Sequence, residues 1–152
     1  MPVLYMLIGV PASGKSTWVK QNRRGAVVAS SDDYIEKQAE RLKSTYNDVF
    51  NDYVKDANRH AQSAAKQAFA DGLDVIWDQT NLTRNSRKSK LAMVPKDYKK
   101  IAVYFPTPAP EVHKKRLDSR PGKSIPDFVM NSMIKTLEPP SKEEGFDEII
   151  SA

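Results

Sequence analysis

Short, almost unbroken apolar runs alternate along the chain with longer segments in which apolar residues recur every three to four positions. A short apolar run between turn residues is typical of a strand buried on both faces, whereas the longer period is typical of a helix. The runs predict strands at residues 3–8, 26–29, 73–77 and 101–105, with a final edge strand at 146–150. The intervening segments predict helices at residues 15–23, 34–43, 48–70, 111–120 and 125–137. A further helix is expected to begin at a cap, Thr83 or Asn85, and to end at residue 93.

Strands that alternate with helices form βαβ units, whose crossovers are right-handed and whose strands are parallel. The pattern therefore predicts an α/β fold with a central parallel sheet flanked by helices. The chain has 152 residues and no internal repeat, so we expect residues 1–152 to form a single domain.

Composition narrows the possible chemistry. Hydrophobic residues make up 39% and charged residues 28%, as in an ordinary folded protein rather than a disordered one. The absence of cysteine excludes disulfides, thiolate zinc sites and cysteine nucleophiles. No apolar run approaches the roughly 20 residues that span a bilayer, so we expect no membrane partner and a cytoplasmic, intracellular protein.

The net charge of +5 is modest, but it is unevenly distributed. Residues 82–124 contain twelve basic and three acidic residues, whereas from residue 138 onward five acids face one lysine. Concentrated positive charge permits a polyanionic partner such as a nucleic acid.

The strongest motif follows the first predicted strand. Residues 9–16, GVPASGKS, match the Walker A pattern GxxxxGK[ST]. Glycines allow the backbone N–H groups to surround a phosphate, and the following helix adds the partial positive charge of its N-terminus. We expect Lys15 to reach the β- and γ-phosphates of ATP, and the Ser16 hydroxyl to bind Mg²⁺. The expected nucleotide-binding residues of this loop are Gly9, Pro11, Ala12, Ser13, Gly14, Lys15, Ser16 and Thr17.

An acidic motif, SSDDY at residues 30–34, follows the second predicted strand. Ligands of open α/β sheets bind beyond the carboxyl ends of the strands, where Asp32 could accept the proton of an attacking hydroxyl. The alternative for Asp32 is a helix N-cap, and Asp33 is expected to be a cap or to support the site. Asp33 and Tyr34 are expected on the substrate side.

A second acidic position ends the third predicted strand. Residues 75–81, VIWDQTN, have the form of a Walker B strand, in which Asp78 holds Mg²⁺ through water. Thr80 and Asn81 in the following turn are expected to face the phosphate acceptor.

The basic helix at residues 111–120 is expected to form a lid over the triphosphate, extending over about 114–124. Arg116 and Arg120 are four residues apart, which places them on one helix face if the helix continues that far. Guanidinium groups over the triphosphate neutralise charge on the transferring phosphoryl group, and a closed lid excludes water. Arg120, beside Pro121 and Gly122, is the expected catalytic arginine. The alternative is a solvated basic face.

Together these motifs resemble the kinase domain of phage-type polynucleotide kinases, within the small P-loop kinases. The resemblance covers nearly the whole chain and rests on residues 8–18, Asp32-Asp33-Tyr34, Thr80-Asn81-Leu82, and Arg116 and Arg120 followed by Ile125-Pro126. It implies that Asp32 is the general base, that Lys15, Ser16 and Arg120 act on the phosphates, and that ATP with Mg²⁺ phosphorylates a nucleic-acid 5′-hydroxyl. It also implies a phage-encoded enzyme in a bacterial host.

The chain departs from the family beside the acidic motif. The family has basic residues there that grip the acceptor strand, whereas this chain has Ser31 and Ile35. Three alternatives therefore stay open: a kinase for a hydroxymethylated pyrimidine (5-hydroxymethyluracil) in phage DNA, a kinase for a nucleoside, sugar or other small molecule, and a nucleotide-dependent binding module. A cationic acceptor groove favours a nucleic acid, and a closed pocket favours a small molecule. DNA or RNA, strandedness and oligomeric state stay undetermined.

Overall fold

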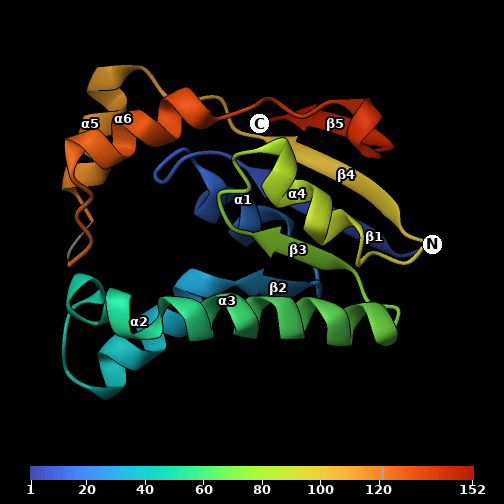
Figure 1. Cartoon of the computed structure of the whole chain (residues 1–152), viewed down its shortest axis with the longest axis horizontal. Helices are drawn as coiled ribbons and strands as arrows, with labels where there is room; N and C mark the ends of the chain where they lie inside the picture. Colours follow the sequence, from blue (N-terminus) through green and yellow to red (C-terminus); the bar gives the residue numbers. More distant parts are fainter. Residues whose placement is uncertain (121) are drawn as a thin grey trace.

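The computed structural model describes residues 1–120 and 122–152, and its centre is a parallel sheet of five strands in the order β2-β3-β1-β4-β5 (Figure 1). The predicted α/β fold, with its parallel sheet between helices, is confirmed. The strands are β1 (Val3–Ile8), β2 (Val27–Ser30), β3 (Val75–Asp78), β4 (Lys99–Tyr104) and β5 (Glu148–Ser151). The helices are α1 (Lys15–Asn22), α2 (Ser31–Arg41), α3 (Tyr46–Ala70), α4 (Arg84–Leu91), α5 (Pro110–Asp118) and α6 (Asp127–Thr136), with a short 3₁₀ helix at Lys142–Glu144.

Helices cover both faces of the sheet, which explains the continuous apolar runs in the strands. Side chains of β1 and β3 pack with α3 and α4 on one face, and with α1 on the other. The long helix α3 lies close to the sheet because the residues it buries there are mostly alanine, among them Ala65 and Ala68. Helices α5 and α6 lie beyond the carboxyl ends of the strands (Figure 1).

Helix boundaries differ from the prediction at the positions that matter most for function. Helix α2 begins at Ser31 rather than at residue 34, and α3 begins at Tyr46 rather than at 48. Helix α5 ends at Asp118, so Arg120 lies beyond it and does not share a helix face with Arg116. Short polar segments that cap helices carry little periodic signal, which is why the apolar pattern misplaces these ends.

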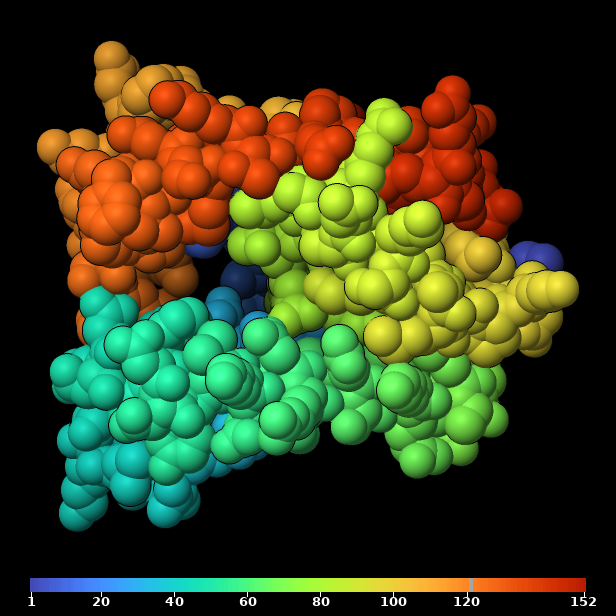
Figure 2. Space-filling view, viewed as in Figure 1, coloured from blue at the N-terminus to red at the C-terminus, as the bar shows by residue number. Residues whose placement is uncertain are grey.

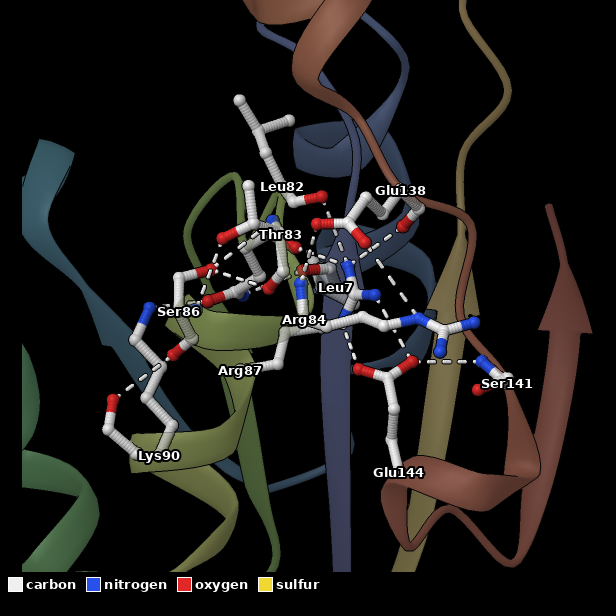
Figure 3. Close-up of polar contacts among 12 residues, drawn as sticks. Leu7, Leu82, Thr83, Arg84, Ser86, Arg87, Lys90, Glu138, Ser141 and Glu144 are labelled. Carbon is white, nitrogen blue, oxygen red and sulfur yellow. Dashed lines mark hydrogen bonds and ion pairs between the residues drawn. The ribbon is translucent and has the colours of Figure 1, made fainter.

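A buried arginine fixes the turn after β3 to the C-terminal part of the chain (Figure 3). The Arg87 guanidinium is fully buried and donates to both carboxylate oxygens of Glu144, at 2.7 and 3.1 Å. It also donates to the carbonyl oxygens of Asn81, Leu82 and Glu138. Burial raises the pKa of the Glu144 carboxyl, but the hydrogen bonds and charge of Arg87 outweigh this effect and lower the pKa below its ordinary value.

We expect Glu144→Ala to lower the free energy of unfolding by about 3 kcal/mol, because the substitution leaves the Arg87 charge buried without its partner. Glu143→Ala, at the exposed neighbouring position, is the control and should have little effect. The lowered Glu144 pKa means that its contribution is complete above pH 4.5, the ordinary value, and is lost as the pH falls through the folded-state pKa. Urea denaturation between pH 3 and 7 checks both expectations. Equal stabilities of the two variants would contradict the assignment.

Candidate active site between two cavities

The glycine-rich loop after β1 has the backbone geometry of a phosphate cradle. Ala12 and Gly14 have positive φ angles of 61° and 109°, and α1 begins directly after them at Lys15. A Cβ atom on Gly9 would lie 2.7 Å from Ser13 Oγ and 2.9 Å from Phe105 Cβ, so only glycine fits there. This turn directs backbone N–H groups and a helix N-terminus to one point, an arrangement suited to an anion.

Lys15 is the buried cation of this loop. Its ammonium group donates to the carbonyl oxygens of Gly9 and Val10, at 2.8 and 2.9 Å. Burial lowers the pKa of Lys15 to about 8, and repulsion from Arg120 adds to this, while Asp78 and Asp32 act in the opposite direction. The lysine is thus held close to two carboxylates and one guanidinium group.

A cavity of about 890 Å³, here called the donor cavity, opens above the loop. It is lined by residues 12–18, by Asp32, Asp33 and Asp78, and by Arg116 and Arg120, among others. Two buried polar atoms beside it, Ser13 Oγ and Arg120 Nη1, have no hydrogen-bond partner among the described residues. Unpartnered buried donors are costly, and phosphate oxygens would satisfy both of them. The residues present therefore fit a triphosphate.

Two side chains in the donor cavity suit a divalent cation. Ser16 lies at the start of α1, and Asp78 is the last residue of β3. Burial raises the pKa of Asp78 to about 6, while Lys15 acts to lower it. The described residues contain no cluster of three or more His, Cys, Asp or Glu side chains placed to hold a metal ion. Oxygen ligands from phosphate and water would complete the coordination, as Mg²⁺ prefers.

Asp32 and Asp33 occupy the first turn of α2, and neither is its N-cap. The cap is Ser30, whose Oγ accepts from the N–H of Asp33 at 3.4 Å. The alternative that Asp32 serves as the cap is therefore wrong, and so is that expectation for Asp33. Burial and the nearby Glu36 carboxylate raise the pKa of Asp33. The Asp32 carboxylate therefore makes no capping hydrogen bond and is left for partners outside its own helix.

One of those partners is Tyr46, which the sequence interpretation missed. The Tyr46 hydroxyl donates to Asp32 Oδ1 at 2.5 Å, and burial with the Asp32 charge raises the Tyr46 pKa. Tyr46 is the first residue of α3, after a capping box formed by Thr45 and Asp48. The spacing Thr45-x-x-Asp48 is a recognisable helix start, and it was the available signal for placing Tyr46 at this end of α3.

The segment after β4 contacts the glycine-rich loop from the opposite side. His113 is buried on α5, with its Nε2 2.8 Å from the carbonyl oxygen of Pro11, consistent with a packing role. Arg116 donates to the carbonyl oxygen of Ala12 at 3.4 Å. Arg120 reaches the cavity from beyond the helix end. Pro121, which belongs to the expected lid, lies outside the described residues.

Residues 122–124 are attached to the start of α3, and we call them the latch. Asn47 N–H donates to the carbonyl oxygen of Gly122 at 3.0 Å. The Asn47 side chain donates to Ser124 Oγ at 2.5 Å and accepts from the Ser124 N–H at 3.1 Å. Lys123 forms an ion pair with Glu36 and lies 4.7 Å above the centre of the Tyr46 ring.

A second cavity, of about 700 Å³ and here called the acceptor cavity, adjoins the first. It lies between α3, α6 and the turn after β3, where the space-filling view shows the surface hollowed between the teal and orange segments (Figure 2). The two cavities share five lining residues: Lys15, Asp32, Asp78, Arg120 and Lys123. The side chains expected to carry out the chemistry therefore lie where the cavities meet.

The remaining predicted residues divide between the cavities and the core. Thr80 and Pro11 line the acceptor cavity, and Gly9 lies beneath the loop. Tyr34 lines neither cavity and packs against Tyr53 and His60. Asn81 is buried, and its amide donates to the carbonyl oxygen of Leu7 at 2.7 Å. The positions of Tyr34 and Asn81 thus give no support to contact with an acceptor.

Fold and site together define the class: a P-loop kinase fold with its glycine-rich loop at the centre of the sheet. Residues 4–140 match the family described as AAA domain, and the chain belongs to that family. No curated protein sequence matches it.

Solved structures share the fold at low sequence identity. A protein of Chloroflexus aurantiacus provisionally described as a kinase superposes with a TM-score of 0.70 at 15% identity, covering 99% of this chain and 84% of that one. A chain of the Pnkp1/Rnl/Hen1 RNA repair complex superposes with a TM-score of 0.68 at 22% sequence identity, and the match covers 96% of this chain but 46% of that one. A gluconokinase from Sinorhizobium meliloti superposes with a TM-score of 0.58 at 20% sequence identity, and the match covers 99% of this chain and 81% of that one.

Within the described residues, no helix combines the length and apolar character needed to cross a bilayer.

We expect Asn47→Ala to speed tryptic cleavage after Lys123 by about tenfold. The substitution removes the side-chain hydrogen bonds to Ser124, and each exposed bond contributes roughly 0.5–1.5 kcal/mol. Asn51→Ala, one turn along α3, is the control, because no hydrogen bond joins Asn51 to residues 122–124. Mass spectrometry of timed digests measures the rate. Equal rates in both variants would mean that Asn47 does not hold the latch closed.

Proposed function

We propose that the chain is an ATP- and Mg²⁺-dependent kinase that transfers the γ-phosphate to a hydroxyl group of a nucleic acid, in the first place the 5′-hydroxyl of a polynucleotide. The observation that carries the proposal is the shared boundary of two cavities. A triphosphate in one cavity and an alcohol in the other meet at Asp32, Lys15 and Arg120. Residues 1–152 then act as one catalytic domain, with residues 114–124 as its lid.

The donor cavity holds the triphosphate in this proposal. Backbone N–H groups of residues 12–17 surround the phosphates, and Lys15 and Arg120 neutralise charge on the γ-phosphoryl group. Arg116 contacts the nucleotide from α5. Ser16 and Asp78 hold Mg²⁺, which when bound neutralises phosphate charge.

Asp32 supplies the base. The acceptor oxygen attacks the γ-phosphorus, the bond from that phosphorus to the β–γ bridging oxygen breaks, and the hydroxyl proton passes to Asp32. Tyr46 donates to Asp32 Oδ1, which fixes the carboxylate orientation and leaves Oδ2 to face the acceptor. An acceptor bound in the second cavity displaces water from this point, which favours transfer to the alcohol over hydrolysis of ATP.

Three observations support a nucleic acid as the acceptor. They are the resemblance of the motifs to polynucleotide kinases, the excess of basic residues at 82–124, and the shared fold with a chain of an RNA repair complex. One observation favours a second candidate, a kinase for a hydroxymethylated pyrimidine or a small molecule. Ser31 and Ile35, which replace basic residues of the family, both line the acceptor cavity, so these two positions supply no cation to grip a strand.

Labelling with [γ-³²P]ATP tests the proposal. The acceptors are 5′-hydroxyl DNA and RNA oligonucleotides, 5-hydroxymethyluracil DNA, and a panel of nucleosides and sugars. We expect transfer to a 5′-hydroxyl oligonucleotide. Transfer only to the modified DNA or to a small molecule would replace the acceptor by the second candidate. ATP binding without transfer to any acceptor would indicate a nucleotide-dependent binding module and reject the kinase.

We expect Asp32→Asn to lower kcat by about 10³-fold with little change in ATP affinity, because an amide cannot accept the proton. Asp33→Asn is a matched control on the next residue and should retain most of the turnover. Steady-state kinetics and ATP titration of both variants separate the two effects. Near-normal turnover of the Asp32 variant would show that the base is another group.

We expect Tyr46→Phe to lower kcat by roughly tenfold at unchanged ATP affinity, since a hydrogen bond to a charged group contributes roughly 1.5–3 kcal/mol. Tyr53→Phe, also on α3, removes a hydroxyl that accepts from Arg41 instead and serves as the control. A Tyr46 variant as active as the Tyr53 variant would rule out a role in orienting Asp32.

A further inference from the structure

Two amide side chains in the acceptor cavity form a hydrogen-bonded chain that begins in the core. The indole N–H of Trp77 donates to Gln79 Oε1 at 3.0 Å, and Gln79 Nε2 donates to Asn58 Oδ1 at 3.0 Å. Trp77 is fully buried in β3, so the start of the chain is fixed in space.

Because an indole nitrogen is a donor only, it fixes the orientation of both amides. Gln79 must present its oxygen to Trp77 and therefore its NH₂ group to Asn58. Asn58 then accepts with its oxygen, and neither of its own side-chain N–H groups has a partner among the described residues. The wall made by Gln79 and Asn58 thus presents N–H donors to the cavity, and it calls for a ligand that accepts hydrogen bonds.

Apolar side chains make up much of the lining near these two amides, together with the neutral polar side chains of Asn51 and Thr80. Phe50 and Val54 line it from α3, and Val129 and Met133 from α6. The cations among its described lining residues are Lys15, Arg120 and Lys123, all at the boundary with the donor cavity. An anionic group such as a phosphate binds best to guanidinium or ammonium groups, so this end suits a neutral ligand.

We infer that Asn58 and Gln79 recognise a ring carbonyl oxygen of a nucleobase, the base of the nucleotide that carries the acceptor hydroxyl. This inference rests on the proposed function. A planar heterocycle fills the space between the apolar side chains of α3 and α6, and its carbonyl oxygen accepts from the amide N–H groups. The two amides are then specificity-determining residues for the acceptor.

A cycle of substrate and protein changes tests the inference. The substrates are two 5′-hydroxyl oligonucleotides, one with thymine and one with an abasic site at the 5′-terminal nucleotide. We expect the wild-type kcat/KM to fall about tenfold on removal of the base. Asn58→Ala should lose about tenfold on the thymine substrate and nothing further on the abasic one. Gln62→Ala, one turn along α3 and outside both cavities, is the control.

Gln79→Glu provides a second variant that alters polarity rather than size. A glutamate still accepts from Trp77 but cannot donate to Asn58, so Asn58 turns its NH₂ group to the carboxylate and its oxygen to the cavity. We expect the same loss on the thymine substrate as for Asn58→Ala. Equal activity of the wild type on both oligonucleotides, or equal losses of either variant on both, would overturn the inference.

A binding measurement keeps this inference separate from the proposed function. The two tryptophans give two indole N–H signals in a ¹⁵N-correlated NMR spectrum, and Trp18→Phe assigns them. We expect thymidine to shift the Trp77 signal in the wild type and deoxyribose to leave it unchanged. A thymidine shift without kinase activity would reject the enzyme and retain the base site. Phosphate transfer to oligonucleotides without a thymidine-induced shift would retain the kinase and reject the base site.

Discussion

The parallel pairing of β1 with β3 and β4 is the constraint on which the rest of the molecule depends. Parallel strands end at the same edge of a sheet, so whatever follows each strand is brought to one place. The glycine-rich loop follows β1, and Asp78 ends β3. The register that places Ser30 opposite Asp78 puts the start of α2, and with it Asp32, beside them. Residues from three separate segments thereby surround a single point.

At that point the opposite charges of Lys15 and Asp78 stabilise each other although both groups are buried. Burial disfavours the charged form of Lys15 and equally that of Asp78, and the pKa of each shifts accordingly. The mutual attraction of the two groups works against both shifts. Arg120 adds a further positive group, and its buried Nη1 has no partner among the described residues. A phosphate oxygen would supply that partner, which is why the donor cavity suits phosphate.

The amino-acid sequence was sufficient to predict the α/β architecture, because buried parallel strands and the glycine-rich loop each have a recognisable local sequence pattern. It was also sufficient to bring Asp32, Asp78 and Lys15 to one edge. It misplaced the starts of α2 and α3, which depend on caps, and it missed a contact between distant segments. Ser30 caps α2, which excludes the alternative role of Asp32 as the cap, and Tyr46 contacts Asp32 from the first position of α3, after the cap Thr45. Neither relation has a periodic signature, since each depends on a single side chain.

Buried polar side chains are also difficult to assign from local sequence pattern. Asn81 looks like a substrate contact because it follows Asp78 in a turn, yet its amide bonds to Leu7 in β1.

Gly122 of the latch has a consequence for how this chain can change over evolution. Its φ angle is 68°, and a Cβ atom there would lie 3.0 Å from the Cβ of Thr45, the residue that caps α3. A side chain at this position is disfavoured twice, by backbone strain and by collision with the cap. Lys114 and Lys115 of α5, by contrast, are exposed, so a replacement there meets neither obstacle. Residue 122 itself should remain glycine in any descendant that retains this closed arrangement.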